Sequence, residues 1–150
     1  MTNLIMAIAT GCFVGYLPIA PGTCGSALAI PIHFLLIRLS TQYYFTALVI
    51  IFVISVVTAG SAEKIIDRKD PGVIVIDEII GMLITLINAP NNIFVWILGF
   101  FIFRFFDILK PFPIGVIDRR INGGIGIVMD DVLAGVYSLI VLRIICRIFF

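Results

Sequence analysis

The sequence predicts an all-α, polytopic membrane protein in which short transmembrane helical hairpins form a single helical bundle. Hydrophobic residues make up 61% of the 150-residue chain, charged residues only 13%, and the mean hydropathy is +1.21. These values lie far outside the range of soluble domains, and a chain of this length is expected to form one domain over residues 1–150. The apolar segments are apolar nearly all round, which is typical of helices buried in a membrane.

Five apolar segments are expected to form the helices, at residues 26–39, 43–60, 73–87, 93–106 and 127–146. Several of them are shorter than the roughly 20 residues that a perpendicular membrane span requires. The stretch before residue 22 is interrupted by Gly and Pro, and the sequence leaves open whether it spans the membrane or re-enters it. It lacks the basic region that opens a secretory signal, so we expect it to belong to the mature chain.

Two short polar turns, at residues 40–42 and 88–92, each join a pair of these segments, so each pair is expected to form a helical hairpin. If both turns lie on one side of the membrane, the charged loops gather on the other side, which the positive-inside rule makes cytoplasmic. Arg143 and Arg147 disagree with this topology, because the last segment should carry them to the non-cytoplasmic side. They fit it only if their side chains snorkel to the far interface. The basic residues expected on the cytoplasmic side are Lys64, Arg68, Lys69, Arg104, Lys110, Arg119 and Arg120.

The composition also limits the partners. A net charge of +1, without a basic stripe, excludes a general nucleic-acid surface. We expect the lipid bilayer to be the main partner, and the oligomeric state stays open.

Five carboxylates stand in or beside the apolar segments on the expected cytoplasmic side: Asp77, Glu78, Asp107, Asp130 and Asp131. Taken singly, Asp77 and Asp130 could cap helices and Asp107 could pair with a nearby cation. Taken together, they would repel one another unless a cation lay among them. An all-oxygen ligand set without histidine favours Mg²⁺. We therefore expect these five residues to be the Mg²⁺ ligands or to include the general base.

Arg104, Asp107 and Lys110 are spaced three residues apart, so on a helix they form one inclined stripe. Pro111 and Pro113 should end that helix just after Lys110, which places the stripe at a membrane surface. Both cations could then flank a bound anion such as a phosphate while the carboxylate holds a metal.

The hexapeptide PGTCGS, at residues 21–26, precedes the first expected helix. Gly22 and Gly25 permit tight turns, Thr23 and Ser26 carry hydroxyls, and the helix that follows would direct its amides at a ligand. A simple capped helix start is the commoner meaning of such a hexapeptide, although the arrangement would suit a phosphate. The segment NGGIG, at residues 122–126, has the same two interpretations.

These features together indicate chemistry on a phosphate ester at the membrane surface. A cysteine phosphatase needs Arg six residues after its Cys, whereas Ile30 stands there after Cys24 and Pro18 after Cys12. An aspartyl phosphatase of the DxD type is also excluded, because no Asp is followed two places later by another Asp. Chemistry through a phosphorylated histidine lacks the residues it needs, because the single histidine, His33, lies in an apolar run without partners. Metal-assisted attack on phosphorus therefore remains, either by water or directly by an Asp.

A small ion or solute transporter with a carboxylate-lined cation site is the competing hypothesis. A transporter would need polar residues through the depth of the membrane, whereas the segments LAIPIHFLLI and LVIIFVISVV are almost wholly apolar.

Four blocks of the sequence carry a resemblance to a known family. PIAPGTCGSALAIP, IVIDEIIGMLITL, FRFFDILKPFPI and DRRINGGIGIVMDDVLAGV resemble, in order and spacing, the signature blocks of the bacterial phosphatidylglycerophosphatase A family, over roughly residues 8–140. Asn122 stands where some relatives have His, so we expect no catalytic role there.

The resemblance implies a Mg²⁺-dependent lipid phosphatase of the bacterial inner membrane, with its active site facing the cytoplasm. Members of the family hydrolyse phosphatidylglycerophosphate to phosphatidylglycerol and inorganic phosphate, which is the last step in making that lipid. The number of metal ions, the identity of the base and the range of other lipid phosphates accepted stay open. The resemblance implies functional roles for Asp77, Glu78, Arg104, Asp107, Lys110, Asp118, Arg119, Asp130 and Asp131, with Thr23 and Ser26 in a phosphate-facing loop.

Overall fold

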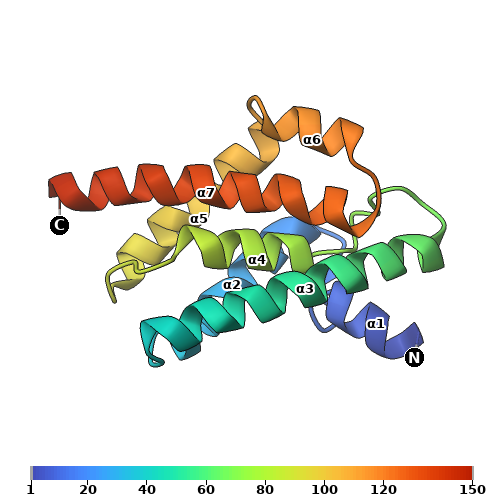
Figure 1. Ribbon diagram of the computed structural model, residues 1–150, viewed down its shortest axis with the longest axis horizontal. Helices are drawn as coiled ribbons and strands as arrows, with labels where there is room; N and C mark the ends of the chain where they lie inside the picture. Colours follow the sequence, from blue (N-terminus) through green and yellow to red (C-terminus); the bar gives the residue numbers. More distant parts are fainter. Residues whose placement is uncertain (1, 150) are drawn as a thin grey trace.

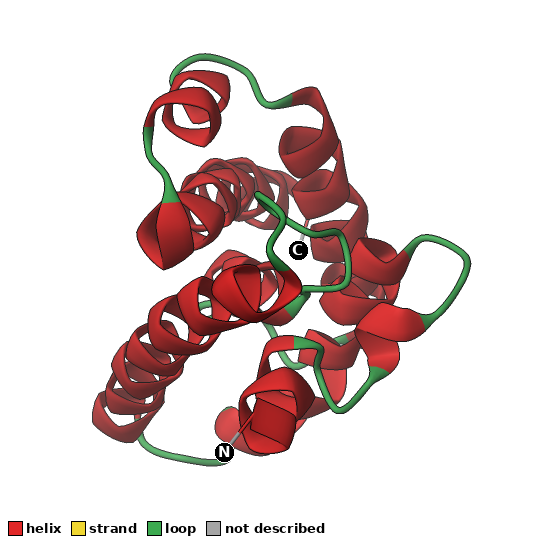
Figure 2. Ribbon diagram, turned by 90° about the vertical axis from the view of Figure 1, so that its right-hand side faces the viewer, coloured by secondary structure: helices red, strands yellow, loops and turns green. Residues whose placement is uncertain are grey.

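The computed structural model describes residues 2–149, and this part of the chain contains helices and loops but no strand (Figure 2). The prediction of an all-α fold is confirmed, and each of the five predicted segments coincides with a helix. Two further helices, α1 and α6, are short and were not predicted. The elements are α1 (Thr2–Ala9), the 3₁₀ turn η1 (Val14–Tyr16), α2 (Pro21–Leu36), α3 (Thr41–Ile66), α4 (Ile76–Thr85), α5 (Ile93–Leu109), α6 (Ile114–Arg120) and α7 (Gly123–Phe149).

Helix α4 is the centre of the bundle. It packs most extensively against α7, and also against α2, α3 and α5. With 10 residues it is only about 15 Å long, roughly half the thickness of a bilayer core. It therefore begins inside the bundle, and a polar residue in its first turn is surrounded by protein. Its buried residues are Ile76, Asp77, Ile79, Ile80, Gly81, Met82, Leu83 and Thr85.

The predicted hairpin of α2 and α3 needs a correction. The two helices are consecutive and joined by a short turn, but each packs mainly against α4 or other helices and hardly against its neighbour in sequence (Figure 1). The reason is that eight of the ten residues of α4 are buried, so this helix must lie between other helices and occupies the place beside α2 and α3. Likewise, α4 has a larger interface with α7 than with α5, its expected hairpin partner.

The connecting loops divide between two ends of the bundle, as predicted. Residues 37–40 and 86–92 lie at the end where the chain terminates, which we call the far end (Figure 1). Residues 67–75 lie at the opposite end, which we call the site end, and residues 110–122, which include α6, lead the chain back toward this end (Figure 1). The turn expected at residues 40–42 contains no Lys or Arg. Because α2 ends at Leu36, however, the loop begins earlier and includes one basic residue, Arg38.

Two helices, α3 and α7, are long and apolar enough to cross a membrane. Helix α3 carries an exposed apolar stripe at Val49, Val53 and Val57, and α7 carries one at Ile140, Ile144 and Ile148. Exposed apolar stripes of this length fit contact with lipid chains. Membrane association is thus supported, and the complete multi-pass topology remains a prediction.

The crossing of α4 and α7 depends on two glycines. A Cβ atom at Gly135 would overlap with the Gly81 carbonyl, and one at Gly81 would lie 2.6 Å from the Asp131 carbonyl oxygen. The two backbones are therefore in direct contact, as small residues allow between membrane helices. Each glycine lies one helical turn after an acidic residue, Asp77 or Asp131, so the contact also brings these two carboxylates together.

We expect Gly135→Ala to lower the free energy of unfolding by about 1–3 kcal/mol, because the added methyl group must push α7 away from α4. Unfolding in detergent micelles, followed by circular dichroism, measures the change. Gly72→Ala is the control, since a Cβ at Gly72 meets nothing within 4 Å. Equal stability of the two variants would contradict a tight crossing.

Candidate metal and phosphate site

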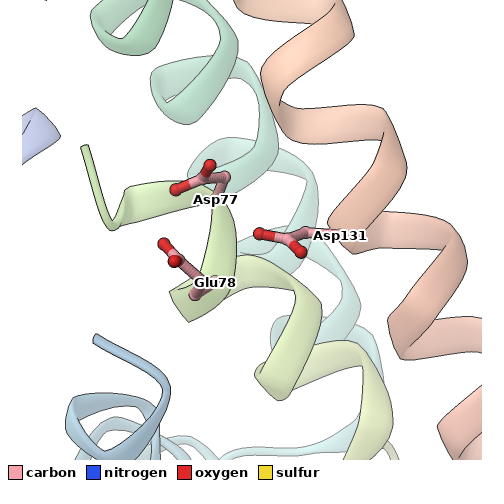
Figure 3. Close-up of side chains that lie close together, drawn as sticks. All are labelled: Asp77, Glu78 and Asp131. Atoms are coloured by element: carbon pink, nitrogen blue, oxygen red, sulfur yellow. The ribbon is translucent and has the colours of Figure 1, made fainter. Parts of the chain in front are cut away.

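Three carboxylates meet where α4 begins beside α7. Asp77 and Glu78 stand in the first turn of α4 and Asp131 lies on α7, and one ligand oxygen of each lies within 4.8 Å of the others. Figure 3 shows the Asp131 side chain extending from α7 toward the first turn of α4, where Asp77 and Glu78 lie next to each other. Asp77 is only 6% exposed and Asp131 only 3%, so water scarcely screens their charges. The cluster thus concentrates negative charge inside the bundle.

Helix capping does not explain these residues. The residue before α4 is Val75, which offers no side-chain cap, and Asp77 lies inside the helix. Asp130 and Asp131 lie well inside α7. The capping alternative for Asp77 and Asp130 is therefore excluded.

Unpaired oxygens in the cluster indicate what it could hold. Asp77 Oδ1 and Glu78 Oε2 are buried and have no hydrogen-bond partner among the described residues. Leaving a buried carboxylate oxygen without a partner costs several kcal/mol, and neighbouring carboxylates add repulsion. A hard divalent cation takes oxygen ligands and would offset both costs. The donor set of Asp77, Glu78 and Asp131 therefore fits such a cation.

Arg104, on α5, borders this cluster. Its Nη1 forms an ion pair with Asp107 and lies 3.4 Å from Ser26 Oγ. The Ser26 hydroxyl donates in turn to the Gly22 carbonyl at 2.8 Å. Asp107 thus pairs with Arg104 and lies outside the cluster of three, while Ser26 links Arg104 to α2.

The start of α2 lies against the same cluster. A Cβ atom at Gly22 would overlap with Glu78 Oε1 and lie 3.3 Å from Arg104 Nη1, so the backbone of α2 lies directly against the end of the Glu78 side chain. The helix already begins at Pro21, which corrects the expectation that Thr23 and Ser26 lie in a loop before it. Its N-cap, Ala20, makes no side-chain cap, and amides in a first turn are suited to an anion. The structure thus places a helix start beside Glu78 and Arg104.

Lys110 departs from the predicted stripe. Helix α5 ends at Leu109, and Lys110 adopts a left-handed conformation as its C-cap. Its Nζ donates to Asp130 Oδ2 at 2.6 Å and to Asp118 Oδ1 at 3.0 Å. The expectation that Arg104, Asp107 and Lys110 form a single helical stripe is therefore wrong, because Pro111 stops the helix before Lys110 can join it. Binding of a phosphate by Arg104 and Lys110 stays a prediction.

Lys110 is held as a cation between two carboxylates. Burial by itself lowers the pKa of Lys110, but hydrogen bonds from its ammonium to Asp130 and Asp118 and their negative charges outweigh burial. The pKa of Lys110 therefore ends above its usual value. The other oxygen of Asp130, Oδ1, is buried and has no partner within residues 2–149.

The remaining predicted residues lie further from the cluster. Arg119 is exposed on α6, and its Nε donates to the Gly115 carbonyl one turn earlier. His33 packs against Trp96 and Tyr44, with Nδ1 3.0 Å from the Tyr44 hydroxyl. Sequence reasoning missed two features, the contact of Gly22 with Glu78 and the pairing of Lys110 with Asp130. The contact of Gly22 with Glu78 could have been suspected from the sequence, because a glycine directly follows the proline at which α2 begins.

The family model described as phosphatidylglycerophosphatase A matches residues 7–146. Phosphatidylglycerophosphatase A of Escherichia coli is 42% identical over 139 residues, which cover 92% of this chain and 81% of the relative. The Haemophilus influenzae protein of the same name is 36% identical over 143 residues, covering 94% and 88%. A Bacteroides thetaiotaomicron protein, provisionally named a phosphatidylinositol-3-phosphatase, is 38% identical over 148 residues, covering 94% and 92%. No solved structure matches the chain significantly.

We expect Lys110→Gln to lower the free energy of unfolding by about 1–3 kcal/mol, because it leaves the buried Asp130 carboxylate without its cation. Arg120→Gln, on the exposed face of α6, is the control and should change stability little. Adding Asp130→Asn to Lys110→Gln should recover part of the loss, and unfolding in detergent measures each variant. Fully additive effects of the two substitutions would contradict the pairing.

Proposed function

Because the chain belongs to the phosphatidylglycerophosphatase A family, we propose that it hydrolyses phosphatidylglycerophosphate to phosphatidylglycerol and inorganic phosphate, the last step in making that lipid. The observation that carries the proposal is the meeting of Asp77, Glu78 and Asp131 with Arg104 and the start of α2. A cluster of carboxylates beside a cation and free helix amides combines the two needs of phosphate-ester hydrolysis, a metal site and an anion site.

Mg²⁺ is the cofactor that we propose for the cluster, held by Asp77, Glu78 and Asp131. When bound, Mg²⁺ supplies charge neutralisation at the phosphate oxygens and lowers the pKa of a coordinated water. Asp107 and Asp130 stay predicted ligands. Each already shares its carboxylate with a cation, Asp107 with Arg104 and Asp130 with Lys110, so each would contact a metal with its charge partly offset.

Arg104 is the residue that we propose to hold the phosphate of the substrate. Its Nη1 is occupied by Asp107 and Ser26, but its buried Nε has no partner in the described part of the chain. A guanidinium oriented in this way can direct its remaining donors at a phosphate oxygen. The amides of the first turn of α2 and the Thr23 hydroxyl add neutral donors on the same side.

Asp130 is the general base that we propose. Its Oδ2 is fixed by Lys110 at 2.6 Å, so Oδ1 is oriented and free to accept a proton. In the step, the oxygen of water bonds to phosphorus, one water proton passes to Asp130 Oδ1, and the bond from phosphorus to the glycerol oxygen breaks. The glycerol oxygen takes up the proton that Asp130 accepted and leaves as a hydroxyl group, so Asp130 is restored and inorganic phosphate remains. Direct attack by an Asp is the alternative step.

The membrane placement that we propose follows from the distribution of basic residues. Seven of the ten Lys and Arg residues lie in the site-end segments or in the parts of the helices nearest to them, while Arg38, Arg143 and Arg147 lie toward the far end. The positive-inside rule then makes the site end cytoplasmic. We accordingly propose a multi-pass protein of the bacterial inner membrane that meets its lipid substrate at the cytoplasmic leaflet.

A second substrate is favoured by one relative. The Bacteroides protein carries the name of a phosphatidylinositol phosphatase and matches almost the whole chain. Hydrolysis of phosphatidylinositol 3-phosphate is therefore the alternative activity, and the two lipids should be compared at equal concentration in the same mixed micelles. The transporter hypothesis is not favoured, since family membership and three named relatives all indicate a phosphatase.

We expect purified protein to release phosphate from phosphatidylglycerophosphate only with Mg²⁺, and Asp77→Asn to lower this rate by about 100-fold or more. Asp67→Asn is the matched control, because Asp67 is an exposed left-handed helix cap, a conformation that Asn tolerates. Phosphate release is measured with and without a chelator. Activity of Asp77→Asn close to that of Asp67→Asn would overturn the site assignment.

We expect Mg²⁺ at about 100 times its dissociation constant to stabilise the wild-type protein by about 2.7 kcal/mol. Asp131→Asn should lose most of this gain, yet unfold at a higher temperature than wild type in chelator, because the substitution removes one of three repelling charges. Thermal unfolding in detergent measures both effects. An undiminished Mg²⁺ gain in Asp131→Asn would remove this residue from the ligand set.

A further inference from the structure

The far end contains a hollow that the proposed reaction does not use. It has a volume of about 460 Å³ and is lined by residues of the loops at 37–40 and 86–92 and of the adjoining ends of α2 and α3. Arg38, Thr41, Asn88 and Asn91 contribute polar side chains to its lining. All four residue types can donate hydrogen bonds to an anion.

An apolar groove of about 480 Å³ adjoins this hollow. The two share Phe34 and Asn91, and the groove continues along Ile30, Pro31 and Trp96 on α2 and α5. Polar donors therefore stand at the end of the bundle, and apolar side chains run from them toward its middle. A ligand that fills both must have a polar head and an apolar tail.

The charge at the far end has one sign. All nine Asp and Glu residues lie in the site-end loops or in the parts of the helices nearest to them, so the charged side chains of the far end are Arg38, Arg143 and Arg147. The Arg38 guanidinium lies 4.5 Å from the centre of the Phe34 ring, which holds it at the junction of hollow and groove. Arg143 donates to the Ile87 carbonyl at 3.0 Å, beside Asn88. No carboxylate side chain in residues 2–149 neutralises these cations.

We propose that the hollow and groove bind one anionic phospholipid, with its headgroup phosphate at Arg38 and an acyl chain along Phe34 and Trp96. The inference relies on the proposed membrane placement and not on the proposed reaction. Charge complementarity selects an anionic lipid over a zwitterionic one. The two sites are separated by the length of α2, about 24 Å for its 16 residues, so this lipid is not the reacting substrate.

Native mass spectrometry of delipidated protein in detergent tests the proposal. The protein is mixed with equimolar phosphatidylglycerol and phosphatidylcholine that carry the same acyl chains. We expect wild type to retain phosphatidylglycerol over phosphatidylcholine by about tenfold, and Arg38→Gln to lose this preference. Arg38→Lys should keep most of it. Arg147→Gln removes a charge from the same end outside the hollow and should behave as wild type.

Four results would overturn the proposal. They are equal retention of both lipids by wild type, an unchanged preference in Arg38→Gln, an equal loss in Arg147→Gln, and equally tight binding of glycerol phosphate without acyl chains. A dimer that disappears in Arg38→Gln would instead assign the hollow to a second copy of the chain. The readout does not depend on phosphate release, so an inactive protein would refute the proposed function and leave this test intact.

Discussion

The burial of three carboxylates in one place is the constraint on which the rest of the structure depends. Asp77, Glu78 and Asp131 lie within 4.8 Å of one another inside a bundle that is otherwise largely apolar. Such a cluster is unfavourable unless cations surround it. The neighbouring elements supply them: Arg104 at the end of α5 and Lys110 at its C-cap, each already paired with a further acidic residue. The stability of the fold and the chemistry of the site therefore depend on the same charges.

Close backbone contact creates the site. The contact of Gly81 with Gly135 places α4 directly on α7, one turn from Asp77 and Asp131, and Gly22 lets the first turn of α2 reach Glu78. A side chain at Gly81 or Gly135 would push the backbones of α4 and α7 apart, and one at Gly22 would displace the end of the Glu78 side chain. The short α4 completes the arrangement, because a helix of about 15 Å that begins inside the bundle carries its first-turn carboxylates to the interior.

The two ends of the molecule differ in charge because acidic residues occur at only one of them. The site end combines carboxylates and cations, as a metal and phosphate site requires, whereas the far end carries arginines alone. For a protein that works on lipids, both ends would face phosphate-bearing surfaces. The same physical interaction, a cation with a phosphate, then serves the proposed substrate binding at one end and the proposed lipid contact at the other.

The sequence by itself determined the all-α class, the five main helices and the identity of the acidic and basic residues of the site. These follow from hydropathy and residue type, which act locally along the chain. Only the tertiary structure decided that α4 separates α2 from α3, that Lys110 pairs with Asp130, and that Thr23 and Ser26 belong to α2. The tertiary structure also decided which of the five candidate carboxylates lie together. Asp77, Glu78 and Asp131 form one cluster, whereas Asp107 pairs with Arg104. Spacing along one helix defines a face, but which faces meet depends on how closely the backbones can approach, and that is a property of the packed bundle.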